Sequence, residues 1–184
     1  MKKILLPLLL LPLAFAACKN DKPANTVTTA EVSTEKVDNA AEQQVSPTIK
    51  TLDPSLKGND ILSAIATDHK GKVVVIDVWA TWCGPCTRAI EEMHPLKKEL
   101  LTKDVAFVYL TDESSPEMEW NKRIQLYQGT HYRIPEAQMA TFDLVGYPSY
   151  IVLDKNGKVA FDNRPTAGFP GNDAIRNIVT PLLK

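Results

Sequence analysis

Two cysteines separated by two residues are the feature of this sequence with the clearest chemical potential. Cys83 and Cys86 stand in the run Trp-Cys-Gly-Pro-Cys. Cysteines this close are poor structural cross-links, because closing a short loop removes little entropy from the unfolded chain. They suit thiol–disulfide exchange, in which the Cys83 thiolate attacks a disulfide and the Cys86 thiol then attacks Cys83 and releases the reduced product. Run backwards, the same pair oxidises dithiols.

The residues around the pair predict how it is positioned. The β-branched apolar run over residues 73–79 predicts a strand buried on both faces, as in a mostly parallel sheet. A helix is predicted from Cys83 onward, so Cys83 faces unpaired backbone N–H groups and the positive end of the helix dipole, which stabilise a thiolate. Gly84 gives the backbone freedom, and Pro85 suits a first helical turn. We expect Cys86, one turn on, to be the more shielded cysteine.

One acidic residue, Asp77, interrupts the otherwise apolar strand that leads to the cysteines. A buried carboxylate without a partner is costly, so its pKa should rise and allow proton exchange near neutral pH. This predicts Asp77 as a proton acceptor from Cys86, through water. The alternative is an aspartate held by a local hydrogen bond.

The rest of the chain after residue 50 alternates strand and helix patterns. The order β-α-β-α-β-β-α indicates an α/β layered domain over residues 51–184. Further strands are predicted over residues 105–110, 149–153 and 158–161. Further helices are predicted over residues 59–67, 114–128, 135–142 and 172–183.

The first seventeen residues have the form of a secretory signal peptide. Lys2 and Lys3 make a short positive region, and residues 4–17 are apolar. That run is shorter than the ~20 residues that span a bilayer. We therefore expect residues 1–17 to be a signal peptide that directs the mature protein out of the cytoplasm.

Cys18 directly follows the sequence Leu-Ala-Phe-Ala-Ala over residues 13–17. This sequence is similar to the lipobox of bacterial lipoproteins, which implies a lipid anchor on Cys18. The alternative is cleavage after Ala16, which would leave Cys18 free near the terminus. Residues 18–50 contain no aromatic residue, no glycine and no sustained apolar period, so we expect a flexible tether, the alternative being a weak docked helix.

Composition argues against several other functions. The net charge of -1 gives no basic surplus for binding nucleic acid. A closed structural zinc site needs four ligands, but the domain has only two cysteines, and His69, His94 and His131 are not paired at ligand spacing. We expect no metal and no cofactor beyond the redox-active cysteine pair itself.

Two blocks of the sequence resemble the thioredoxin superfamily, and within it the TlpA/ResA-like envelope disulfide reductases. They are VVIDVWATWCGPC, residues 74–86, and GYPSYIVLDKNGKV, residues 146–159. The resemblance implies a thioredoxin-like fold, with a central mixed sheet flanked by helices and a helical insertion before the cis-proline strand. It also implies that Pro148 is a cis-proline facing the disulfide and that Tyr147 offers its backbone to an extended substrate. Trp82 would be an exposed docking surface.

The function that these observations favour is a membrane-tethered reductase of envelope client proteins. Its partners would be clients with disulfides or thiols and an upstream thiol electron donor in the membrane. In the family such clients include apocytochrome c, and Gly84-Pro85 resembles the dipeptide of reducing members. The alternatives are an envelope dithiol oxidase or disulfide isomerase and, from another class, a metal-binding module such as a copper chaperone. Chaperones of that kind resemble a longer C-x-x-x-C with a histidine, which this sequence lacks.

Overall fold

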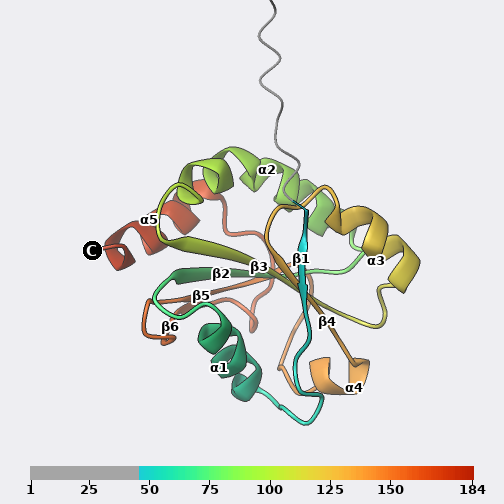
Figure 1. Cartoon of the computed structure of the whole chain (residues 1–184). Helices are drawn as coiled ribbons and strands as arrows, with labels where there is room; N and C mark the ends of the chain where they lie inside the picture. The colour runs from blue at the N-terminus through green and yellow to red at the C-terminus, as the bar shows by residue number, and fades with distance from the viewer. Residues whose placement is uncertain (1–45) are drawn as a thin grey trace, which may run out of the picture. The chain divides into compact units, whose positions relative to one another are not determined.

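The computed structural model of the protein describes residues 46–184 (Figure 1). Its elements in chain order are β1 (Thr48–Lys50), α1 (Asn59–Asp68), β2 (Val73–Val78), α2 (Gly84–Leu100), β3 (Val105–Asp112), α3 (Glu117–Ile124), β4 (Thr130–Ile134), α4 (Glu136–Met139), β5 (Ser149–Leu153), β6 (Val159–Asp162) and α5 (Asn172–Leu182). The strands form one sheet in the order β1-β4-β3-β2-β5-β6. The β1–β4, β4–β3 and β3–β2 pairs are parallel, and the β2–β5 and β5–β6 pairs are antiparallel. The predicted α/β fold with a mixed sheet flanked by helices is confirmed.

The central strand β2 is buried along its whole length because both faces of the sheet are covered. Val74, Ile76 and Val78 belong to a core shared with α1 and α4, whereas Val73 and Val75 belong to a core shared with α2 and α5. Figure 1 shows α2 and α5 on one side of the sheet and α1 and α4 on the other. Side chains alternate between the faces of a strand, so a strand covered on both sides has a continuous apolar sequence.

Helix α2 begins directly after Cys83, as predicted. Cys83 is the N-cap, with extended backbone angles, and its Sγ accepts a hydrogen bond from the Cys86 N–H at 3.1 Å. Pro85 lies in the first turn, where its missing N–H costs no hydrogen bond. The cysteines therefore lie where the carboxyl end of β2 meets the amino end of α2.

The predicted boundary at residue 51 is wrong, because the sheet already includes Thr48–Lys50. This strand, β1, pairs with β4 and places Ile49 opposite His131. It forms an exposed edge of three residues, a length at which alternation gives almost no sequence signal. Residues 1–45, with the predicted signal peptide, Cys18 and most of the predicted tether, lie outside the described residues.

The segment between β3 and β5 contains two helices and one strand. The helices α3 and α4 were predicted, although α3 is shorter than expected. The strand β4 was missed, and with it the burial of His131. β4 lies between β1 and β3 in the sheet, and four of its five residues are buried. His131 is fully buried, with its ring stacked on Tyr109 of β3.

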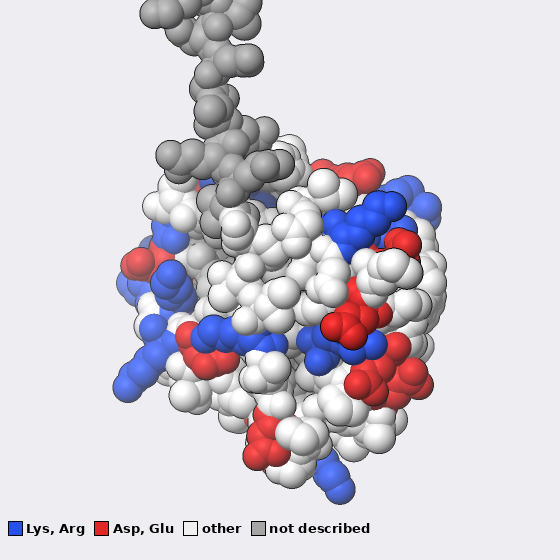
Figure 2. All heavy atoms as spheres, turned by 45° about the vertical axis from the view of Figure 1, so that its right-hand side comes forward, with Lys and Arg blue, Asp and Glu red and all other residues white. Residues whose placement is uncertain are grey.

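No helix within residues 46–184 combines the length and the apolar character needed to cross a bilayer. On the face drawn in Figure 2, Lys and Arg side chains are interspersed with Asp and Glu side chains. This distribution agrees with the net charge of -1.

Candidate active site

The Cys83–Cys86 pair is present as a disulfide, with the two Cα atoms 5.3 Å apart. Cys83 retains 5% of its surface exposed, whereas Cys86 has none. The neighbouring Gly84 and Pro85 are exposed. An incoming group therefore approaches over Gly84-Pro85 and reaches Cys83 before Cys86.

An aromatic cluster packs around the two cysteines. Trp79 is fully buried there and meets the Tyr127 ring edge-on, with the ring centroids 5.5 Å apart. Trp120 and Ile124 of α3 belong to the same cluster. Helix α3 therefore supplies part of the wall behind the disulfide.

Trp82 and Tyr147 form an exposed aromatic pair beside the disulfide. The Trp82 side chain is 60% exposed, and its ring meets the Tyr147 ring edge-on at 5.5 Å. The Trp82 Nε1–H donates to Ser114 Oγ at 3.1 Å, and the Tyr147 hydroxyl donates to Asp112 Oδ2 at 2.9 Å. These bonds join the loops that follow β2 and β3 to the loop that precedes β5.

Asp112 and Ser114 are site residues that the sequence analysis missed. Both lie at the carboxyl end of β3, and the Ser114 N–H donates to Asp112 Oδ1 at 2.9 Å. The signal that could have found them is their place at the end of the parallel strand next to β2. Residues that follow neighbouring parallel strands meet at one edge of a sheet.

The Tyr147–Pro148 peptide bond is cis, as the resemblance implied. Ser149 pairs with Val78 across β5 and β2, so Pro148 lies at the edge of the sheet where β2 enters the active-site loop. The Pro148 carbonyl accepts a hydrogen bond from Gly168 at 2.7 Å. Within residues 46–184, the backbone N–H and C=O of Tyr147 make no hydrogen bond.

A row of buried polar side chains crosses the sheet beneath α2. Strand register places Tyr150 of β5, Asp77 of β2, Tyr109 of β3 and His131 of β4 side by side. The Tyr150 hydroxyl donates to Asp77 Oδ2 at 3.0 Å, and Asp77 Oδ1 has no hydrogen-bond partner among the described residues. Burial raises the pKa of Asp77 to about 7, although the Tyr150 hydrogen bond and the Lys97 charge oppose the rise.

Lys97 of α2 adds a buried positive charge to this row. Its side chain is 5% exposed, and its Nζ donates to the Tyr109 hydroxyl at 2.7 Å. Burial lowers the pKa of Lys97 to about 8, and the nearby Asp77 charge limits the fall. No local pattern indicates this burial, because Lys97 stands in a helix in which other charged residues, such as Glu91 and Glu92, are exposed.

His131 completes the row without carrying a charge at neutral pH. Its ring stacks on Tyr109, with the centroids 4.9 Å apart, and its Nε2 donates to the Tyr127 carbonyl at 2.7 Å. Burial lowers the pKa of His131 to about 4. Across residues 46–184, no three His, Cys, Asp or Glu side chains are grouped as they would be around a metal ion.

Comparison with known proteins places this geometry in a family. The model of the family described as Redoxin matches residues 40–173. The thioredoxin-like protein YneN of Bacillus subtilis is 30% identical over 50% of this chain and 56% of its own length. The thiol-disulfide oxidoreductase ResA of Geobacillus thermodenitrificans is 28% identical over 50% of this chain and 55% of its own length. The chain thus spans about half the length of the curated relatives it matches.

A solved structure supports the fold independently. A thiol:disulfide interchange protein of the thioredoxin family from Chlorobium tepidum superposes with a TM-score of 0.53 and 22% identity, over 65% of this chain and 85% of the other. The family model, the sequence relatives and the shared fold agree with the motif at residues 83–86 and the cis-proline before β5. The chain belongs to the Redoxin family and is a TlpA/ResA-like member of the thioredoxin superfamily.

Proposed function

We propose that this protein is a thiol–disulfide oxidoreductase that reduces disulfides in exported client proteins. The observation that carries the proposal is the Cys83–Cys86 disulfide at the amino end of α2, where Cys83 Sγ accepts the Cys86 N–H. Backbone N–H groups at a helix start stabilise a thiolate on the attacking sulfur. The curated relative from Geobacillus carries the name thiol-disulfide oxidoreductase.

The proposed reaction proceeds in two exchange steps. In the reduced protein, the Cys83 thiolate attacks a client disulfide, and one client thiolate leaves as the mixed disulfide forms. Cys86 then loses its proton and attacks Cys83 Sγ, and the second client thiolate leaves. Two electrons have then passed to the client, and the protein holds the Cys83–Cys86 disulfide. An upstream dithiol donor reduces this disulfide for the next cycle, so the cysteine pair is the only redox group required.

Asp77 is the group that we assign to the proton on Cys86. With a pKa of about 7, it is present in both protonation states near neutral pH. An acid–base group works best when its pKa lies close to the working pH. Its Oδ1 has no hydrogen-bond partner among the described residues, so it can accept a proton through a water molecule.

The client contacts in this proposal come from the exposed rim of the disulfide. The Trp82 indole offers an apolar surface, and Gly84 and Pro85 leave the approach to Cys83 open. The backbone N–H and C=O of Tyr147, unused among the described residues, can pair with an extended client segment that lies beside Pro148.

The proposed location is the cell envelope, on the periplasmic side. The support is the sequence of residues 1–18, which resembles a signal peptide followed by a lipidated cysteine. A lipid on Cys18 and the tether after it would hold the domain beside a membrane-bound thiol donor. Mass spectrometry of the protein purified from membranes would show diacylglycerol on Cys18, and an unmodified Cys18 there would overturn the anchor.

Two assays on one preparation test the direction of electron flow. A reductase should accelerate the reduction of insulin disulfides by dithiothreitol and should leave the rate of disulfide formation in a reduced test protein nearly unchanged. The matched control is the double variant Cys83→Ser, Cys86→Ser, which should match the uncatalysed rate in both assays. Strong acceleration of disulfide formation, with none of insulin reduction, would favour the oxidase.

Removing the Trp82 side chain should weaken binding of protein substrates without changing the chemistry at sulfur. We expect Trp82→Ala to raise KM for insulin by about three- to tenfold, because an exposed aromatic contact contributes about 1 kcal/mol. The rate of reaction with a small disulfide such as glutathione disulfide should stay within about twofold of the wild-type rate. The control is Met118→Ala, which removes an 81% exposed apolar side chain from α3. Equal effects of the two variants on KM would contradict the assignment.

A further inference from the structure

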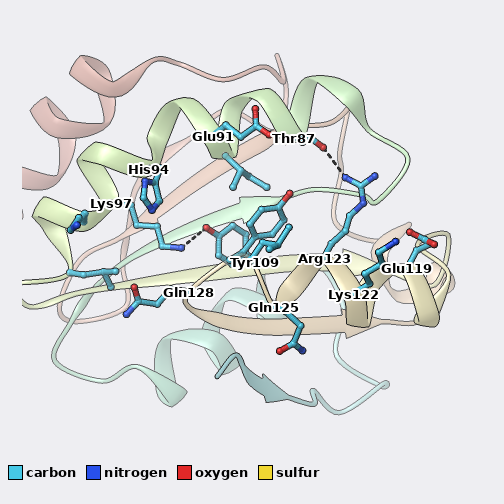
Figure 3. Close-up of a pocket in the computed structure, with 15 residues that line it drawn as sticks. Thr87, Glu91, His94, Lys97, Tyr109, Glu119, Lys122, Arg123, Gln125 and Gln128 are labelled. Atoms are coloured by element: carbon cyan, nitrogen blue, oxygen red, sulfur yellow. Dashed lines mark hydrogen bonds between the residues drawn. The ribbon is translucent and has the colours of Figure 1, made fainter. Parts of the chain in front are cut away.

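A groove of about 1010 Å³ lies between α2 and α3 (Figure 3). Its walls include the apolar side chains of Ile90, Leu101, Leu126 and Tyr127. Lys97 and Tyr109 also line it, and Figure 3 shows these two side chains pointing toward each other from α2 and β3. The volume is at the upper end of the ~300–1,000 Å³ typical of small-molecule sites.

The groove contains one buried charge, the ammonium group of Lys97. This group has three N–H donors, and among residues 46–184 its one hydrogen bond goes to the neutral hydroxyl of Tyr109. No carboxylate of the described residues lies within ion-pair distance of Lys97. Burying an unpaired charge is costly, so an anion that entered the groove and paired with this ammonium would be stabilised there.

The rim of the groove carries charges of both signs. Lys122 and Arg123 of α3 lie on it together with Glu91 and Glu119. Arg123 already donates to Thr87 Oγ1 at 3.2 Å across the groove, which Figure 3 also shows. The Lys and Arg side chains of this rim would attract an acidic peptide, and its Glu side chains would repel it. The Lys97 ammonium is buried beside apolar lining residues, and Asp77, whose charge acts on it, does not lie within ion-pair distance. This arrangement fits a single carboxylate attached to an apolar body.

We propose that the groove between α2 and α3 binds a small amphipathic carboxylate. Its carboxylate pairs with the Lys97 ammonium, and its apolar part packs against Ile90 and Leu126. The largely exposed Leu126 side chain, 77% accessible, is covered when the ligand is bound. Neither Cys83 nor Cys86 lines the groove, so the ligand would not touch the disulfide. Its carboxylate would act on the chemistry only through Lys97, whose charge lowers the pKa of Asp77.

Octanoate is a suitable probe, titrated into the oxidised full chain by calorimetry, with octanol and chloride as matched comparisons. We expect saturable binding of octanoate, and binding of octanol weaker by about tenfold or more, because octanol lacks the carboxylate. Lys97→Met keeps the apolar stem and removes the charge, and it should weaken octanoate binding by at least about tenfold. The control Lys122→Met, on the rim, should change the affinity by less than about threefold.

A second measurement on the wild-type chain covers the case in which the Lys97 variant fails to fold. In the octanoate complex, nuclear Overhauser contacts should link the ligand methylenes to the methyl groups of Ile90 and Leu126. The proposal is overturned by the absence of saturable octanoate binding, by equal affinity of folded Lys97→Met, or by ligand contacts elsewhere. Tighter binding of an acidic peptide than of octanoate, competing for the groove, would also overturn it.

Discussion

Replacing Cys86 with serine is expected to trap the protein as a mixed disulfide with its client. Cys83 remains at the start of α2, where it can still attack, but no thiol is left to release the product. Turnover with insulin should fall by at least about a hundredfold, while a covalent protein–client adduct accumulates. Non-reducing electrophoresis and mass spectrometry of the adduct would locate the bond at Cys83.

The matched control for this trap is Cys83→Ser. It removes the same number of sulfur atoms but leaves, of the active-site pair, only Cys86, which has no exposed surface. This variant should lose turnover to a similar extent and should accumulate no adduct. If Cys83→Ser traps the client and Cys86→Ser does not, the assigned roles of the two cysteines are reversed.

Replacing Asp77 with asparagine is expected to remove a pH-dependent loss of stability. The pKa of Asp77 rises on folding from its ordinary value of 3.8 to about 7, because the carboxyl group is buried. Between these values the folded state holds a proton that the unfolded state has released. The stability contributed by this group is therefore complete below pH 4 and is lost as the pH rises through 7. From pH 5 to pH 7 the free energy of unfolding should fall by about 2 kcal/mol more in the wild type than in the variant.

Urea unfolding of the oxidised proteins at pH 5 and pH 7 measures this difference. His131, whose pKa falls to about 4 on folding, contributes the opposite trend, but it does so in both proteins and cancels. In the variant, the lost Asp77 charge lets the pKa of Lys97 fall further, which increases the expected difference. The control is Glu113→Gln at an exposed position on the loop before α3. An equal change in the free energy of unfolding between pH 5 and pH 7 for wild type and Asp77→Asn would contradict the burial of an ionisable Asp77.

The sequence was informative where one local pattern determines the structure. The continuous apolar run that forms β2 and the Cys-Gly-Pro-Cys start of α2 both follow from residues close together in the chain. Asp77 was found because a charge stands out in an apolar strand. The cis state of Pro148 came from resemblance, because a cis bond is a minority state for any proline taken alone.

The site residues that were missed depend on contacts between distant segments. Lys97 is buried because its side chain lies over Tyr109 of β3, and no helix period indicates such a contact. His131 is buried where its ring stacks on Tyr109 of β3 and bonds to the Tyr127 carbonyl, contacts that depend on the pairing of β4 with β3. Asp112 joins the site through the Tyr147 hydroxyl, a partner 35 positions away in the sequence.

The equilibrium reduction potential of the Cys83–Cys86 disulfide tests the central claim most directly. It is measured in glutathione or dithiothreitol buffers by alkylating the free thiols and quantifying the reduced and oxidised forms by mass spectrometry. Thioredoxin lies near ~-270 mV and the oxidant DsbA near ~-120 mV. The reductase account predicts a reversible couple below about -230 mV on this scale. A value above about -150 mV, or no reversible couple between the two cysteines, would contradict it.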